Sequence, residues 1–162
     1  MIQMEICVIF QKNHQIHKEK YMKKIESERA LKELFECRNH EKPFVLIIGK
    51  NGCPNCKMLV SAIEAAPTSD FPDNVDLYDY IMQDEDFNDG SFIMKDLDEI
   101  TGSPVMTLPY VVYVEAGMNN IKTGGMLPIS MFTDKVKKLS ESKIDESVEE
   151  SSDDTGCASC HV

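Results

Sequence analysis

The chain has 162 residues and a mass of 18.3 kDa, and its 42% hydrophobic content is enough for one compact domain with its own core. It carries 28 acidic against 17 basic side chains, a formal net charge of −11 at pH 7. Phosphate backbones and anionic lipid headgroups repel such a surface, so we expect neither nucleic acid nor membrane as a partner.

The first 21 residues leave two interpretations open. Alternating apolar residues between Ile2 and Phe10 fit a first strand. Alternatively, translation begins at Met22, because Lys18-Glu19 can be encoded by a ribosome-binding sequence at a suitable distance before it. The segment lacks the basic leader and the small-residue cleavage site of a secretory signal, which favours a cytoplasmic protein. Cysteines of such a protein stay reduced unless they exchange disulfides or bind metal.

The next segments change from a helical to an extended pattern and back. Helical periodicity predicts a helix over 23–37, and Pro43 excludes its continuation. The continuous apolar run 44–48 is typical of a strand that is covered on both faces. Pro54 is well placed as the first residue of a helix, and Pro67 ends that helix.

The second half of the chain continues the alternation and then becomes acidic. Its pattern predicts a strand over 75–82, an acidic loop over 84–89, a helix between Ser91 and Gly102, a hairpin of strands 108–114 and 121–123, and a last helix from Pro128. This order predicts an α/β fold of three layers, a central mixed sheet with helices on both faces, over residues 22–140. Residues 141–162 are acidic and rich in serine, and we expect them to form a disordered tail.

The most informative motif is Cys53-Pro54-Asn55-Cys56, at the start of the helix that Pro54 opens. Only a thiolate attacks a disulfide, and a free cysteine, with a pKa near about 8.5, is mostly protonated at neutral pH. Unpaired backbone N–H groups and the positive end of the helix dipole stabilise an anion at this position. Cys53 is therefore the predicted nucleophile, and Cys56, one turn further on, the predicted resolving cysteine.

Two lysines flank the motif. Lys50 precedes Cys53 by three residues and Lys57 follows Cys56 directly. Both are expected to add positive charge near the Cys53 thiolate. The set of supporting residues at the motif is therefore Lys50, Pro54, Asn55 and Lys57.

From residue 23 to residue 140 the chain resembles the thioredoxin superfamily. The resemblance is carried by residues 42–48 leading into the Cys-Pro-Asn-Cys motif, by Thr107-Leu108-Pro109 with the strand that follows, and by Gly124-Gly125. It implies a thioredoxin-like fold in which Pro109 is a cis-proline beside the active cysteines and Leu108 presents its backbone to an extended substrate. The position six residues before Cys53, a buried acid in thioredoxins, is Ile47 here.

A second cysteine pair, Cys157 and Cys160 followed by His161, lies at the end of the acidic tail. A flexible chain of about twenty residues reaches roughly 25 Å, so this dithiol could return to Cys53 and relay electrons. Chance metal binding, or no role, is the alternative.

These patterns predict a cytoplasmic, monomeric thiol–disulfide oxidoreductase that reduces protein disulfides. Its only redox group would be the Cys53–Cys56 disulfide itself, with no bound metal and no other cofactor. Its partners would be disulfide-containing proteins and an upstream reductase. Two alternatives stay open: a binding or metal-carrying module, in which Cys53, Cys56 and the tail cysteines share zinc, and a glutathione-dependent enzyme similar to glutaredoxin.

Overall fold

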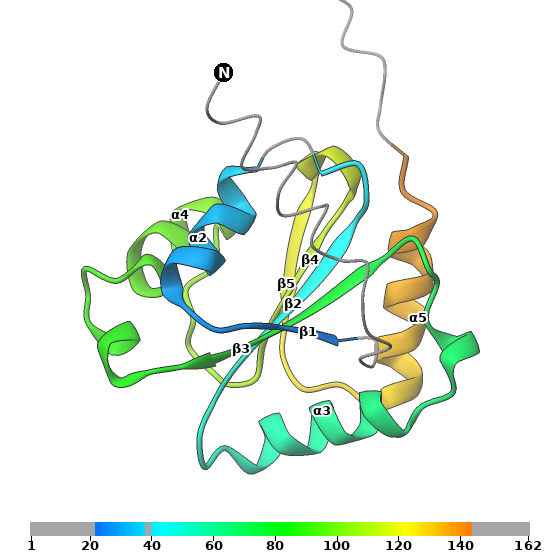
Figure 1. Cartoon of the computed structure of the whole chain (residues 1–162), viewed down its shortest axis with the longest axis horizontal. Coiled ribbons are helices and arrows are strands. Elements are labelled where there is room, and N and C mark those ends of the chain that lie inside the picture. Colours follow the sequence, from blue (N-terminus) through cyan, green and yellow to red (C-terminus); the bar gives the residue numbers. More distant parts are fainter. Residues whose placement is uncertain (1–21, 38–39, 144–162) are drawn as a thin grey trace, which may run out of the picture.

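The computed structural model describes residues 22–37 and 40–143. Its sheet has five strands, in the order β1-β3-β2-β4-β5 (Figure 1). Strands β1, β3 and β2 are parallel, whereas β4 is antiparallel to both β2 and β5. The strands are β1 (Met22–Ile25), β2 (Phe44–Lys50), β3 (Asp76–Met82), β4 (Tyr110–Val114) and β5 (Ile121–Gly124).

Helices cover both faces of this sheet, which confirms the expected three-layer α/β architecture (Figure 1). One face packs against α2 (Glu28–Glu36) and α4 (Leu97–Thr101), through residues such as Leu34 and Leu97. The other face packs against α3 (Pro54–Ala65) and α5 (Ile129–Ser140), through residues such as Ile63 and Phe132. Short helical turns complete the connections: η1 (Thr68–Asp70), η2 (Asp84–Phe87), η3 (Phe92–Asp96) and η4 (Ala116–Met118).

Strand β2 is the centre of the fold. It pairs with β3 on one side and β4 on the other, and only its last residue, Lys50, is exposed. A strand that is covered on both faces has no solvent-exposed face, so polar and apolar residues do not alternate along it. This explains the continuous apolar run in the sequence. Its carboxyl end leads directly into the turn before α3, so a buried strand at the centre of the sheet positions the Cys53 motif.

The predicted helix over 23–37 is wrong in its first third. Residues Met22–Ile25 form strand β1, and α2 begins only at Glu28, where the Ser27 side chain accepts a hydrogen bond from Ala30 N–H at 3.2 Å. Strand β1 is held by parallel pairing with β3 and by an ion pair between Lys23 and Asp76 at 2.9 Å. The helical preference of lysine is worth only roughly a few tenths of a kcal/mol, so the pairing of β1 with β3 outweighs the preference of Lys23 and Lys24 for a helix.

The other predicted elements are present with shifted ends. The helix expected between Ser91 and Gly102 is a π-helical turn, η3, followed by the short α4. Ser91 caps it, accepting a hydrogen bond from Met94 N–H, and Gly102 ends it at φ 66°. Strands β4 and β5 form the expected antiparallel hairpin.

The structure does not describe two of the predicted segments in full. The N-terminal extension 1–21 lies outside the described residues, as does the predicted tail from residue 144 onward. None of the helices in the described part of the chain combines the length and the apolar character that crossing a membrane requires.

Candidate active site

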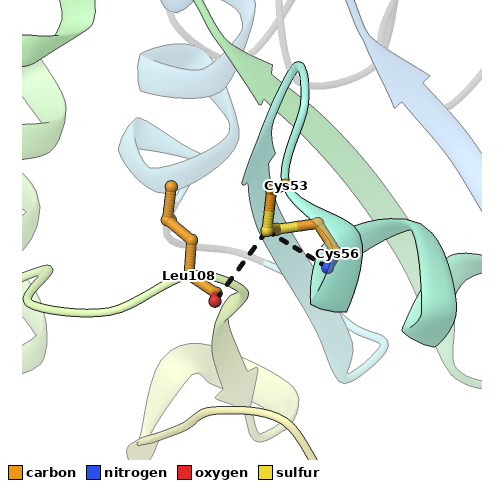
Figure 2. Close-up of a disulfide and its surroundings, with 3 residues drawn as sticks. All are labelled: Cys53, Cys56 and Leu108. Carbon is orange, nitrogen blue, oxygen red and sulfur yellow. Dashed lines mark hydrogen bonds between the residues drawn. A yellow bond between two sulfur atoms is a disulfide. The ribbon is translucent and has the colours of Figure 1, made fainter.

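The two cysteines of the motif lie at the start of α3. Cys53 is the N-cap residue and Pro54 the first residue of the helix, where the missing N–H of proline has no cost. Cys53 Sγ accepts a hydrogen bond from Cys56 N–H at 3.2 Å, so a free helix N–H points at the sulfur. The two cysteines form a disulfide across a Cα–Cα distance of 5.3 Å (Figure 2). The motif therefore closes into a disulfide within one helical turn.

The two cysteines differ in their surroundings more than in their exposure. Cys53 is 7% exposed and lines a surface groove, whereas Cys56 is 4% exposed and does not line it. Cys56 packs directly on the backbone of β2 at Gly49, where an added Cβ would lie 3.2 Å from Cys56 Sγ. Glycine at this position makes room for the second cysteine beneath the helix.

The loop before β4 approaches Cys53 from the other side. The Leu108–Pro109 peptide bond is cis, and Pro109 is buried at the start of β4. The Leu108 carbonyl oxygen is directed at the disulfide, 3.9 Å from Cys53 Sγ (Figure 2). The structure thus brings Leu108 to the Cys53–Cys56 disulfide, although it lies 55 positions after Cys53 in the sequence.

The groove beside Cys53 has a volume of about 600 Å³ and is mostly apolar. Methionine and phenylalanine side chains from the segment between β3 and β4 form its wall, and Met106 is 81% exposed. A more polar hollow of about 470 Å³ adjoins it and shares Lys50, Met82 and Phe87 with it. The groove is lined by Lys50, Gly52, Cys53, Pro54, Met82, Phe87, Met94, Val105, Met106, Thr107 and Leu108.

No protein-family model matches the sequence, and no curated protein matches it either. Among solved structures, several thioredoxins superpose on most of the chain. Thioredoxin O1 from Arabidopsis thaliana covers 75% of this chain with all of its own length, at 13% identity and a TM-score of 0.53. Thioredoxin NaTrxh from Nicotiana alata covers 78% with 99% of its own length, at 16% identity and a TM-score of 0.52. Chloroplastic thioredoxin z covers 76% with 97% of its length, at 18% identity and a TM-score of 0.51.

The chain has a thioredoxin fold.

Within this thioredoxin fold, the supporting residues predicted from the sequence take different positions. Lys50 ends β2 beside the groove, with its ammonium 5.9 Å from the centre of the Phe87 ring. Asn55 and Lys57 are exposed on the first turn of α3, and neither lines the groove. The tail residues Cys157 and Cys160 lie outside the described residues. Across residues 22–37 and 40–143, no three His, Cys, Asp or Glu side chains cluster closely enough to hold a metal ion.

Sequence patterns alone missed two features of the structure. Phe87, Met94 and Met106 line the groove, but they come from an irregular segment whose path no periodicity predicts. Asp79 was missed as well, although it carries a signal: it is an acid inside the otherwise apolar end of β3.

Asp79 is a buried acid on the side of the sheet that α3 covers. It is 6% exposed, and its Oδ1 is one of two fully buried side-chain oxygens without a hydrogen-bond partner in the described residues; Tyr113 carries the other. Burial raises the pKa of the Asp79 carboxyl; Lys24 partly offsets this rise by lowering the pKa, and Glu64 adds a smaller increase. The residue is therefore poised to change its protonation state above the pH range of an ordinary aspartate.

We predict that Asp79→Asn stabilises the protein at pH 7. The folded-state pKa is raised, so folding favours the protonated acid, and stability is lost as the pH rises from about 4, the unfolded pKa, through the folded pKa. Asparagine avoids the buried charge, so the variant should gain roughly 1 kcal/mol or more at pH 7 and little near pH 4. Urea unfolding at both pH values measures the difference in the free energy of unfolding between the variant and wild type. A difference that favours the variant less at pH 7 than at pH 4 would contradict the prediction.

Proposed function

We propose that the protein is a thiol–disulfide oxidoreductase that reduces protein disulfides with the Cys53–Cys56 dithiol. The observation that carries the proposal is the position of Cys53, which caps α3 and faces an open groove while its partner lies buried three residues on. A helix N-terminus stabilises the thiolate, and the groove gives a substrate access to it. The thioredoxin fold supports the same chemistry.

The reaction has two exchange steps. The Cys53 thiolate attacks one sulfur of the substrate disulfide, forming a mixed disulfide and releasing the other substrate sulfur as a thiolate, which takes up a proton. The Cys56 thiolate then attacks Cys53 Sγ, which releases the second substrate thiol and leaves the Cys53–Cys56 disulfide. Two electrons pass from the protein to the substrate, and an upstream thiol reductant restores the dithiol. We assign no further cofactor to this cycle.

The remaining residues of the site would bind and orient the substrate. An extended segment lying along the groove would meet the backbone of Leu108 next to Cys53, with Pro109 holding that backbone in place. Lys50 would place positive charge at the rim of the groove. Pro54 and Asn55 form the exposed first turn between the two cysteines, and Lys57 adds charge one turn along.

The proposal is tested by the reduction of insulin with dithiothreitol as the upstream reductant. Purified protein should accelerate the reaction in proportion to its concentration, and the matched variant Cys53→Ser/Cys56→Ser should not. Absence of acceleration, together with stoichiometric metal in the purified full-length protein, would favour the metal-carrying module instead. Recycling by glutathione alone would assign the protein to the glutathione-dependent class.

We further propose that its protein partners carry basic residues next to their disulfides, and that it acts as a monomer in the cytoplasm. The exposed acids Asp84 and Glu85 line the hollow that adjoins the groove, and the whole chain has a net charge of −11. Opposite charge accelerates encounter and orients the partner.

The charge preference gives a direct prediction. Glu85→Lys should lower kcat/KM by about threefold to tenfold for a disulfide peptide that carries arginine beside its cysteine, because it reverses the field at the hollow. A neutral peptide should be affected little, and high salt should remove the difference. Asp134→Lys on α5 changes the net charge equally but lies outside the groove, so it is the matched control. Equal effects of the two variants would contradict the prediction.

A further inference from the structure

Three exposed apolar side chains gather in the groove beside Cys53. Among the described residues, seven large apolar side chains are exposed, and Phe87, Met94 and Met106 are the three of them that line this groove. Met106 is 81% exposed, Phe87 45% and Met94 36%. Single exposed apolar residues are ordinary on a protein surface, whereas several around one hollow mark a place where another molecule binds.

The wall that carries Phe87 is firmly held. Asp86, the residue before it, is buried, and its Oδ2 accepts hydrogen bonds from the Tyr80 hydroxyl and the Gln83 backbone N–H, both at 2.7 Å. The same segment continues into η3, on which Met94 lies. The exposed side chains therefore belong to an ordered framework that is present before a substrate arrives.

The rest of the groove offers little to a polar group. Met82 is buried, and Leu108 packs against the core with part of its surface open. Besides Cys53, the polar side chains that line the groove are those of Lys50 and Thr107. A strongly polar side chain that entered here would lose water and gain few hydrogen bonds, whereas an apolar one gains from burial.

The occupant of the groove must carry the sulfur that Cys53 attacks. Because Cys53 itself lines the groove, the residues covalently next to that sulfur lie against the same wall. Asp84 and Glu85 line the adjoining hollow, and their charges disfavour glutathione, which is itself negatively charged, relative to a neutral or basic polypeptide. The apolar lining and the charge together indicate an extended segment of a protein.

We propose that this groove binds a large apolar side chain next to the cysteine that Cys53 attacks, so that disulfides flanked by leucine, methionine or phenylalanine are the preferred substrates. This inference rests on the proposed function and adds the substrate class. The apolar side chain lies against Phe87, Met94 and Met106. Any basic residue beside the disulfide faces the adjoining acidic hollow.

Methionine in the wall makes the selection one of polarity more than of shape. An unbranched thioether side chain adopts many conformations and fits apolar partners of different shapes. Leucine, methionine and phenylalanine should consequently be accepted about equally, and serine poorly.

The test uses dimeric peptide disulfides that differ only in the residue on each side of the cysteine, which is leucine, methionine, phenylalanine or serine. Fully reduced protein in excess is mixed with each peptide, the reaction is quenched with acid, and the released peptide thiol is measured by chromatography. Each rate constant is divided by that of dithiothreitol with the same peptide, which removes differences in intrinsic reactivity. The apolar peptides should react about tenfold to a hundredfold faster than the serine peptide, and within about threefold of one another. Oxidised glutathione should react more slowly than all three.

Substitution of Met106 tests the wall itself. Met106→Gln keeps nearly the same length without the apolar end, and it should lower the leucine-to-serine ratio at least about threefold. Met106→Leu stays apolar and should keep that ratio within about twofold of wild type. The matched control is Met131→Gln on α5, which should leave the ratio unchanged because Met131 is exposed but does not line the groove. Both methionines are exposed, so these substitutions are not expected to disturb the fold.

Equal rates for the leucine and serine peptides would overturn the proposal. Equal effects of Met106→Gln and Met131→Gln, or a faster reaction of oxidised glutathione, would overturn it as well. In each of these cases, disulfide reduction by the wild type leaves the proposed function standing. A wild type that reduces neither the peptides nor insulin refutes the proposed function itself.

Discussion

Cys53→Ser is expected to reduce insulin-disulfide turnover to the uncatalysed background, a loss of at least about a thousandfold. The serine hydroxyl does not ionise at neutral pH, and the helix N-terminus then has no thiolate to stabilise. Cys56→Ser should also abolish turnover, but at the second step: the Cys53 thiolate still attacks, and the mixed disulfide has no resolving partner.

Trapping distinguishes the two cysteines. Cys56→Ser should accumulate a covalent adduct with insulin that reducing agents release, and Cys53→Ser should accumulate none. Intact-protein mass spectrometry under non-reducing conditions measures both. An adduct in the Cys53→Ser variant would mean that Cys56 is the nucleophile and Cys53 the resolving cysteine. Turnover that survives in either variant would refute the dithiol mechanism.

Phe44→Ala is expected to lower the free energy of unfolding by about 3–5 kcal/mol, the largest effect on stability that we predict. Phe44 is fully buried at the start of β2, where its ring packs against those of Phe35, His40 and Tyr78. Truncation removes these contacts and leaves a cavity between the sheet and α2. Such a loss is a large share of the 5–15 kcal/mol or so that stabilises a typical domain.

Urea unfolding followed by circular dichroism measures the loss. Met131→Ala on α5 is the control, because its side chain is 52% exposed and alanine suits a helix at least as well. That variant should stay within about 0.5 kcal/mol of wild type. A loss below about 1 kcal/mol for Phe44→Ala would mean that this cluster contributes little to the core.

The parts of the fold that could be predicted from sequence are those with a local physical cause. The apolar run of β2 has only one environment that suits it, a strand covered on both faces. Pro54 marks the start of α3, and Ser91 and Gly102 mark the limits of the segment formed by η3 and α4, because caps act within a few residues.

The parts that could not be predicted depend on distant contacts. Strand β1 contains two lysines and has no strand pattern of its own; its conformation comes from pairing with β3, more than fifty residues later. The same holds for the site. The motif itself identifies Cys53 and Cys56, but the approach of Leu108 and of the methionines of the groove depends on how the chain returns to the sheet.

The two outermost strands of the described sheet are its shortest, with four residues each, and both carry lysine: Lys23 and Lys24 on β1, and Lys122 on β5. Open backbone groups at a sheet margin invite another copy of the chain to add a strand. Short margins with cationic side chains oppose such stacking, since two like copies would bring their ammonium groups together. The protein should consequently resist fibril formation when it is concentrated, and neutralising these lysines is the change most liable to reverse that resistance.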